Sequence, residues 1–245
     1  SGWDRDPDAI AAAVGSGVIA SGAGSLAGAV AAADVVFAAA PVGALPRLAH
    51  EVLARAAPGA VVSDVGSTKR TIVEAIADPR FVGGHPLAGA ETSGLEHASG
   101  ALFQGSTWYL TPSAATSTDA IVRVEALIAE FGATVTHIDA AQHDSLMAAV
   151  SHLPHVFANV LLAHLLQTSG PSAIGPSFRD ATRVAGSNPA VWSSIYIDNR
   201  DEVVKAIDHA IELLEAVRGD LDRADADALL HWCQRAAADR ERFGR

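Results

Sequence analysis

The stretch Ala60-Val61-Val62-Ser63-Asp64-Val65-Gly66-Ser67-Thr68-Lys69 decides the fold class of this chain. Its first half is a short apolar run rich in valine, without the polar alternation of a strand that faces water on one side. Such a run is typical of a strand covered on both faces of a sheet. The second half is polar and leads into a helical pattern over residues 68–77. The stretch therefore predicts a buried strand, a polar turn and a helix in direct succession.

The same succession recurs through the first 140 residues. One further helix begins at the capping cluster Ser117-Thr118-Asp119 and ends at Gly132. Strands and helices in this rhythm predict an open, Rossmann-like α/β sheet. The further strands are predicted at residues 34–39, 80–84, 107–111 and 134–138, and the further helices at residues 43–57 and 118–131.

No strand is predicted after residue 140. Residues 141–167 form one long apolar helical pattern that should bend at Pro154, because the proline ring removes a backbone hydrogen bond. Two more helices are predicted at residues 201–218 and 224–240. Helices this apolar and this few would expose apolar faces if the domain stood alone. We therefore expect a second subunit to cover them in a homodimer, and a core within the domain is the alternative.

The chain is therefore expected to consist of two domains. Residues 1–140 would form the α/β domain, and residues 141–245 would form the all-helical domain. No internal repeat and no low-complexity linker interrupts this division.

The composition restricts the partners of this protein. With 28 acidic against 17 basic residues the formal net charge is -11, which disfavours binding to nucleic acid and to anionic membranes. The one cysteine, Cys233, excludes an intrachain disulfide and suits a reducing cytosol. The longest apolar run, around residues 156–166, is interrupted by Asn159 and His164 and falls short of the roughly 18 residues of a membrane span. We therefore expect a cytoplasmic protein.

Two glycine-containing stretches near the N-terminus indicate different structures. Gly15-Ser16-Gly17-Val18-Ile19-Ala20 matches a relaxed G-x-G-x-x-A fingerprint, but residues 8–14 before it have the character of a helix and not of a strand. These glycines therefore indicate a helix end and a loop. Gly2-Trp3-Asp4-Arg5-Asp6-Pro7 resembles the end of the second Rossmann strand, where an acid binds a ribose. The first strand and its glycine turn would then lie roughly 20 residues upstream of that acid, before residue 1.

Polar residues that packing does not explain gather in four stretches. The first two, residues 63–69 and 83–94, each follow a predicted strand, which is where ligands bind in open α/β sheets. The third runs from His143-Asp144 to Ser151-His152-Leu153-Pro154-His155 on the long helix. The fourth covers residues 178–192.

These four stretches resemble motifs of the TyrA family of prephenate and arogenate dehydrogenases. The family's D-x-G-S-x-K, H-P-M-A-G-x-E-x-S-G, S-H-L-P-H and T-R-x-A-x-S-x-P-x-x-W motifs occur here in the same order, with Leu87 in place of methionine. The resemblance covers essentially the whole chain apart from the missing glycine turn. It implies an oxidoreductase of tyrosine biosynthesis, with a dinucleotide-binding domain over residues 1–140 and a substrate and dimerisation domain over residues 141–245.

The resemblance also implies a role for individual residues. The family oxidises the ring carbon that bears a hydroxyl, passes hydride to a nicotinamide and releases the ring carboxylate as carbon dioxide. His85 is then the expected base for the hydroxyl proton, and Ser67 should orient His85 and the hydroxyl. Arg183 should bind a substrate carboxylate with its planar fork. His155 should help to hold the substrate, and Trp192 should line the pocket.

The cofactor is expected to be a nicotinamide dinucleotide. Asp4 favours NAD, because a carboxylate accepts hydrogen bonds from the ribose hydroxyls and repels a 2′-phosphate. Arg5 beside it could pair with that phosphate, which leaves NADP open. Pro41 and Val42 resemble the loop along the dinucleotide, and Ser67 is expected near the nicotinamide.

Several of these residues also have a purely structural interpretation. His85 could cap a turn, and Ser67 could be the N-cap of the helix that follows. Arg183 could form a salt bridge with Asp180 or Asp198. Trp192 could belong to the core.

Other polar residues of the four stretches are ambiguous in the same way. His152 and His155 lie on one helix face and could form a metal pair, although no further ligand set accompanies them and the family needs no metal. His143-Asp144 is interpreted as a helix start, and Lys69 and Glu91 as solvated ends of their motifs.

Two other functions compete with this one. A dehydrogenase of the β-hydroxyacid type would use a lysine of the helical domain, where Lys205 is the one lysine and has no supporting motif. A non-catalytic dimeric or regulatory homologue is suggested by the missing glycine turn. The set His85, Ser67 and Arg183 argues against it, since a scaffold does not need these residues. No residue distinguishes prephenate from arogenate.

Overall fold

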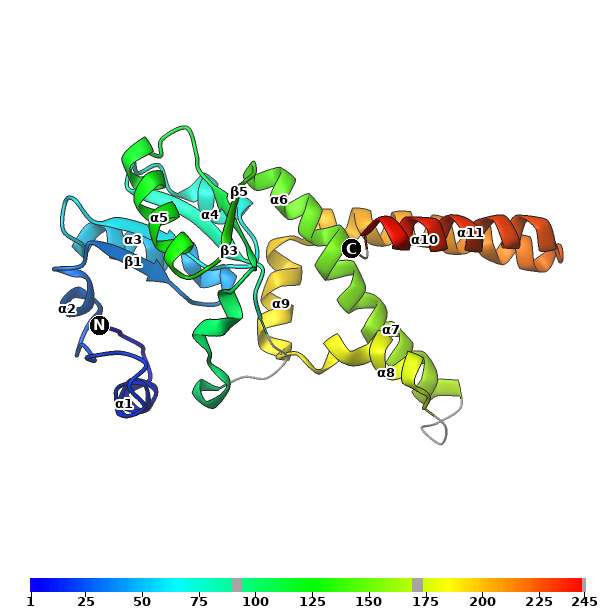
Figure 1. Cartoon of the computed structure of the whole chain (residues 1–245), viewed down its shortest axis with the longest axis horizontal. Coiled ribbons are helices and arrows are strands. Elements are labelled where there is room, and N and C mark those ends of the chain that lie inside the picture. The colour runs from blue at the N-terminus through cyan, green and yellow to red at the C-terminus, as the bar shows by residue number, and fades with distance from the viewer. Residues whose placement is uncertain (90–93, 169–173, 244–245) are drawn as a thin grey trace. The chain divides into compact units, whose positions relative to one another are not determined.

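Five strands form one sheet, as the sequence predicts (Figure 1). The computed structural model describes residues 1–89, 94–168 and 174–243. The strands follow one another across the sheet in chain order, and β4 is antiparallel to β3 while the other neighbours are parallel. In the described part of the connection between β3 and β4, only two short turns were found, η2 (Leu95–His97) and η3 (Gly100–Phe103). This agrees with the antiparallel direction of β4, because an antiparallel pair of strands needs no crossover helix. The strands are β1 (Val35–Ala38), β2 (Val61–Asp64), β3 (Phe81–Pro86), β4 (Thr107–Thr111) and β5 (Thr134–His137).

Helices cover both faces of the sheet. The neighbours Val61 and Val62 point to opposite faces, and both side chains are buried, which explains the unbroken apolar run in β2. On one face, Val62 packs with η1 (Val42–Ala44), α3 (Leu45–Arg55) and α4 (Arg70–Ala75). On the other face, Val61 packs in the cluster to which α5 (Thr118–Glu130) contributes.

The N-terminal segment forms α1 (Pro7–Gly15) and α2 (Leu26–Val30), and α2 was not predicted. The side chain of Asp6 accepts a hydrogen bond from the Asp8 backbone and caps α1. The helix ends at Gly15, and Gly17 has a φ of 75°. Residues 15–20 are therefore a helix end and a loop, as predicted. Gly2 forms an isolated parallel bridge with Gly22.

The predicted helix at residues 141–167 is confirmed as a continuous helical stretch of three parts. It consists of α6 (Ala140–Met147), a π-helical turn η4 (Ala148–His152) and α7 (Leu153–Thr168). The wider π turn ends at His152, two residues before Pro154, whose missing N–H interrupts the α-helical ladder. By length and composition alone, the stretch Ala140–Thr168 is long and apolar enough to cross a membrane. The sequence analysis did not expect this, because it treated Asn159 and His164 as interruptions. A hydropathy averaged over a window of residues tolerates such isolated polar side chains.

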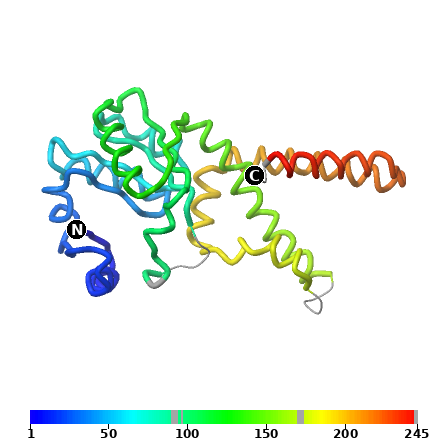
Figure 2. The backbone as a smooth tube through the Cα atoms, viewed as in Figure 1, coloured from blue at the N-terminus to red at the C-terminus, as the bar shows by residue number. Residues whose placement is uncertain are grey.

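The described residues divide into two compact units at Arg200. The first unit ends with α8 (Pro176–Thr182), η5 (Arg183–Gly186) and α9 (Pro189–Asp198). The second unit, Asp201–Arg245, contains most of α10 (Arg200–Asp222) and all of α11 (Ala226–Phe243), which are the two predicted C-terminal helices (Figure 2). A short turn joins α10 to α11, and Ala224 adopts a φ of 53° in it.

Candidate active site

A buried ion pair links the end of β2 to the start of α4, and both of its partners are hydrogen-bonded to β3. The Asp64 carboxylate pairs with Lys69 and accepts the backbone N–H groups of Gly66, at 2.8 Å, and Gly84, at 3.1 Å. Lys69 Nζ also donates to the Gly84 carbonyl, at 2.7 Å. Burial lowers the pKa of Lys69, and the attraction of Asp64 opposes that shift. Lys69 is fully buried, so its interpretation as a solvated motif end was wrong. Glu91 lies outside the described residues.

Gly84 brings β3 close to β2. A Cβ atom at this position would lie 2.7 Å from the Asp64 carbonyl oxygen and 2.9 Å from the Ser63 hydroxyl. Neither atom can move far, because the carbonyl belongs to the backbone of β2 and both residues are fully buried. The glycine therefore permits the strand approach that places the next residue, His85, at the end of β3.

His85 is the first member of a buried hydrogen-bonded chain. Its Nδ1 lies 2.8 Å from His143 Nε2, and His143 Nδ1 lies 2.8 Å from Asp144 Oδ1. His85 is 9% exposed, while His143 and Asp144 are buried. Burial, and after it the neighbouring His143, Lys69 and His152, hold the pKa of His85 well below its usual value. The His85 ring is therefore neutral at neutral pH and able to accept a proton.

Asp144 also holds the start of α4. Its carboxylate accepts the backbone N–H of Lys69, at 2.7 Å, and of Arg70, at 2.9 Å. The helix begins at Arg70 and has no side-chain cap from its own N-cap residue, so Ser67 is not the N-cap. His143 and Asp144 are the fourth and fifth residues of α6, so they stand near the start of a helix as interpreted, but the cap of that helix is Asp139.

Ser67 stands in the turn between β2 and α4. Its side chain is partly exposed, and its hydroxyl makes no hydrogen bond to any residue that the structure describes. The next residue, Thr68, donates to Asp198 of α9, at 2.6 Å. This bond ties the turn to the helical part of the unit.

His152 is buried beside the hydrogen-bonded chain of His85, His143 and Asp144. Asn199 donates to the Asp144 carbonyl, at 2.8 Å, and its Nδ2 lies 3.2 Å from His152 Nδ1. Burial lowers the pKa of His152 to about 4, against the attraction of Asp144. His152 is therefore neutral under ordinary conditions and positions its neighbours as a core histidine.

His155 and Trp192 form a parallel ring stack. Their ring centroids are 3.6 Å apart and their planes differ by 1°. His155 Nδ1 is hydrogen-bonded to the Tyr196 hydroxyl, and Asn159 lies 3.2 Å from the same nitrogen. His155 Nε2 is buried and has no hydrogen-bond partner among the described residues. No group of three metal-ligating side chains was found within the described part of the chain.

Arg183 lies at the start of η5, where its side chain is exposed. This turn packs against α7, the helix that carries His155. Lys205, the alternative catalytic lysine, is 70% exposed and pairs with Glu202 at 2.7 Å. An exposed, paired lysine gives no support to the β-hydroxyacid interpretation.

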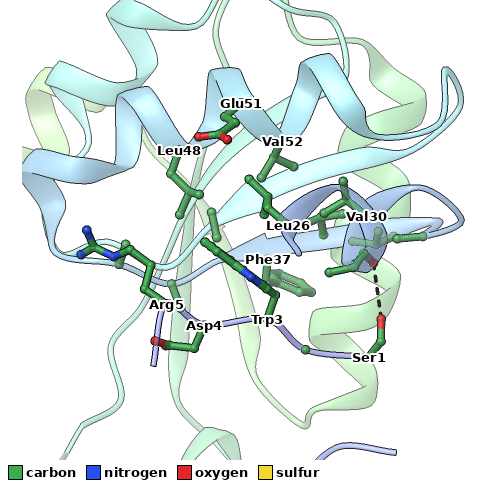
Figure 3. Close-up of a pocket in the computed structure, with 18 of the residues that line it drawn as sticks. Ser1, Trp3, Asp4, Arg5, Leu26, Val30, Phe37, Leu48, Glu51 and Val52 are labelled. Carbon is green, nitrogen blue, oxygen red and sulfur yellow. Dashed lines mark hydrogen bonds between the residues drawn. The ribbon is translucent and has the colours of Figure 1, made fainter. Parts of the chain in front are cut away.

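A separate cleft of about 1310 Å³ lies along β1 and α3 (Figure 3). Asp4, Arg5 and Pro41 line it, together with the carboxyl end of β1. Figure 3 shows Asp4 and Arg5 on the N-terminal segment and Leu48 on α3. Val42 does not line the cleft but is buried in the core beside it. Ser67 and His85 do not line it either.

Two sequence profiles cover nearly all of the chain. The profile described as "Prephenate dehydrogenase, nucleotide-binding domain" matches residues 1–137, and the profile described as "Prephenate dehydrogenase, dimerization domain" matches residues 139–235. This chain belongs to the prephenate dehydrogenase family.

Known members of the prephenate dehydrogenase family resemble the chain in sequence and structure. It is 34% identical to cyclohexadienyl dehydrogenase of Zymomonas mobilis, over 81% of this chain and 71% of that protein. It is 32% identical to prephenate dehydrogenase of Bacillus subtilis over 72% of this chain, and the match spans only 50% of that relative. The crystal structure of Aquifex aeolicus prephenate dehydrogenase in complex with hydroxyphenyl propionate and NAD+ matches with a TM-score of 0.93 and 31% identity, over 99% of this chain and 88% of that one.

The prephenate dehydrogenase fold brings together residues that the sequence analysis did not combine. His143 and Asp144 were noted in the third polar stretch but were not joined to His85, which lies 58 residues away. Tyr196 and Asn199 were not singled out at all. An unusual density of histidines on one helix, at His143, His152 and His155, was the one available signal.

Proposed function

We propose that this chain oxidises prephenate or arogenate with a nicotinamide dinucleotide and releases the ring carboxylate as carbon dioxide, a step of tyrosine biosynthesis. The observation that carries the proposal is the buried chain from His85 through His143 to Asp144, which places a neutral imidazole at the end of β3. The names of the two curated relatives, a cyclohexadienyl and a prephenate dehydrogenase, support the same reaction.

His85 acts as the base in this proposal. It takes the proton of the ring hydroxyl as the carbon–hydrogen bond of the same ring carbon breaks. Ser67 orients that hydroxyl, and its own hydroxyl has no other partner among the described residues. The carbon–carboxylate bond then breaks, and its electron pair enters the ring, which becomes aromatic. Alignment is therefore the main task of the protein.

Arg183 and His155 hold the substrate. The Arg183 guanidinium stays charged and matches the two oxygens of a carboxylate. His155 Nε2 is buried without a partner among the described residues, and a buried polar atom left in that state costs about 1–3 kcal/mol. A substrate oxygen would satisfy it. The stack on Trp192 and the bond to Tyr196 fix the ring of His155 for this contact.

NAD fits the cleft beside β1. Its volume of about 1310 Å³ exceeds the ~300–1,000 Å³ of ordinary small-molecule pockets, as an extended dinucleotide requires. Asp4 would accept hydrogen bonds from a ribose, and Pro41 would border the dinucleotide, while Val42 would support that loop from the core instead of contacting the cofactor. When bound, the nicotinamide supplies the acceptor for the hydride. Arg5 also lines the cleft, so NADP is to be tested beside NAD.

The helical region, residues 141–245, would form a homodimer, with residues 1–140 as the dinucleotide-binding domain. The match of residues 139–235 to a dimerisation domain supports this arrangement. Large apolar side chains are also exposed on α7, where Val160 is 55% and Leu166 is 66% exposed, and on α10, where Leu214 is 57% exposed. We place the protein in the cytoplasm, which fits its one cysteine and its acidic composition.

Reduction of the dinucleotide by the purified full-length protein tests the proposed function. Prephenate and arogenate are each combined with NAD and with NADP, and the release of carbon dioxide is measured beside absorbance. Turnover with one pair is the expected result and selects substrate and cofactor together. A folded, dinucleotide-binding protein that turns over neither substrate would refute the proposal and leave the non-catalytic homologue as the better description.

A further inference from the structure

The hydrogen bonds around Asp144 determine where the proton of each histidine lies. The Asp144 carboxylate accepts two backbone N–H groups, from Lys69 and Arg70, and its Oδ1 lies 2.8 Å from His143 Nδ1. Backbone N–H groups can only donate, and a carboxylate that accepts such bonds is held in its ionised form. A protonated carboxyl would also lose one of these acceptor sites. Asp144 is therefore the acceptor in its bond to His143.

The two histidine tautomers follow by elimination. Because Asp144 only accepts, His143 must carry a proton on Nδ1, and neutral His143 then has a bare Nε2. That bare nitrogen lies 2.8 Å from His85 Nδ1, so His85 must donate from Nδ1. The neutral His85 ring is left with an unprotonated Nε2. This nitrogen is the one that can accept a proton from a ligand.

We propose that His143 and Asp144 are positioning residues for His85: they hold it in the Nδ1–H tautomer and take over the positive charge when its Nε2 accepts a proton. In that transfer His85 Nε2 gains the substrate hydroxyl proton, and the Nδ1 proton passes to His143 Nε2. His143 becomes an imidazolium beside the Asp144 carboxylate, and His85 is neutral again. No electron is exchanged, and the positive charge moves one residue inward. The inference rests on the proposed function for the source of the proton, but the resting tautomer is independent of it.

The surroundings of His85 favour this transfer. A cation on His85 would be buried near Lys69 and His152, and burial with these neighbours lowers the pKa of His85. A cation on His143 instead touches an anion, at 2.8 Å. The ionisable groups around the two rings come from five elements: Asp64 at the end of β2, Lys69 at the N-cap of α4, Tyr109 on β4, Asp144 on α6, and His152 in the π turn.

Two substitutions separate the parts of the proposal. Asp144→Asn presents an amide that can donate to His143, which reverses both tautomers and puts a proton on His85 Nε2. His143→Gln keeps an oxygen where Nε2 was, so His85 still donates from Nδ1, but this oxygen cannot keep the transferred proton. His137→Gln is the matched control, because His137 also pairs with a carboxylate, Glu125, but on an exposed surface outside the chain of bonds.

The protonation of each histidine ring nitrogen is read by ¹⁵N NMR of the full protein, and kcat and KM are measured on the same samples. We expect a bare Nε2 on His85 in the wild type and a protonated one in Asp144→Asn, with kcat lower by roughly 10²–10⁴-fold and KM little changed. His143→Gln should keep the wild-type tautomer and lose less of kcat. His137→Gln should alter neither quantity.

Each failure has its own signature. A proton on His85 Nε2 in the wild type overturns the positioning role even if the enzyme is active. So does an Asp144→Asn variant that keeps the wild-type kcat, or a His143→Gln variant as impaired as Asp144→Asn. If the wild type has the expected tautomer but oxidises neither substrate, the proposed function fails and the tautomer assignment stands. Should Asp144→Asn not fold, the wild-type spectrum and His143→Gln still decide the question.

Discussion

Replacing Lys69 by methionine removes the counter-ion of a buried carboxylate without leaving a large cavity. Asp64 would retain only the backbone N–H groups of Gly66 and Gly84, and the Gly84 carbonyl would lose its donor. Breaking a buried pair by removing one partner costs about 3–5 kcal/mol, because an uncompensated charge stays in the interior. That is a large share of the ~5–15 kcal/mol that stabilises an ordinary domain. We therefore expect Lys69→Met to be strongly destabilised.

Urea unfolding followed by far-ultraviolet circular dichroism measures the loss. With a slope of about 1–3 kcal/mol per molar urea, a loss of about 3–5 kcal/mol should lower the midpoint by roughly 1–5 M. Lys205→Met is the matched control, because Lys205 is 70% exposed and its pair with Glu202 should contribute no more than about 1 kcal/mol. The double variant Asp64→Asn with Lys69→Met removes both charges and should recover part of the loss. A Lys69→Met midpoint equal to that of Lys205→Met would refute the reasoning.

Three further outcomes are expected. Gly84→Ala should cost about 1–3 kcal/mol in the same urea assay, since its Cβ would meet the Asp64 carbonyl at 2.7 Å, whereas Gly59→Ala, with open space around it, should be nearly neutral. The pKa of His152 is lowered to about 4 in the folded protein, against about 6.5 in the unfolded chain. As the pH falls, the His152 ring therefore takes up a proton in the unfolded state before it does so in the folded state. The free energy of unfolding should therefore decrease by up to about 3 kcal/mol as the pH falls from ~6.5 towards about 4. The same free energy should decrease less over this pH range in His152→Gln. Arg183→Gln should raise KM for the substrate by about tenfold or more, with a smaller change in kcat. The reason is that a hydrogen bond from a charged guanidinium to a carboxylate contributes about 1.5–3 kcal/mol. An unchanged KM would show that Arg183 does not bind the substrate.

The strands were predictable because each satisfies a local rule. The run from Ala60 to Val62 is apolar, short and followed by the polar residues Ser63 and Asp64, and β2 occupies residues 61–64. The antiparallel direction of β4 was not predicted, because no local pattern of residues 107–111 reports strand direction. The helix α2 is five residues long and rich in alanine and glycine, so it carries too little periodicity to be recognised.

The site was predictable only where a motif named a residue. His85, Ser67, His155 and Trp192 were selected by resemblance, and their roles remain proposals. Lys69 was interpreted as solvated because a charged side chain after a strand normally is, and only the fold shows that Asp64 turns back to meet it. The contacts of His143 and Asp144 were not predicted, because their partners His85 and Lys69 lie 58 and 75 residues away in the sequence. The π turn also disturbs the helical period between these two residues and His155.

The cap of α4 also has a consequence for how the protein folds. This six-residue helix depends on a carboxylate that the ribosome adds 74 residues after Arg70, so its first turn cannot be secured until α6 has been made and has docked. A fragment that ends at residue 137 would contain the strands and His85, yet lack both the anchor of that helix and the partner of that imidazole. The base and the scaffold beneath it should consequently become ordered in one late, cooperative event, and hydrogen exchange at Lys69 and Arg70 should report the moment at which it happens.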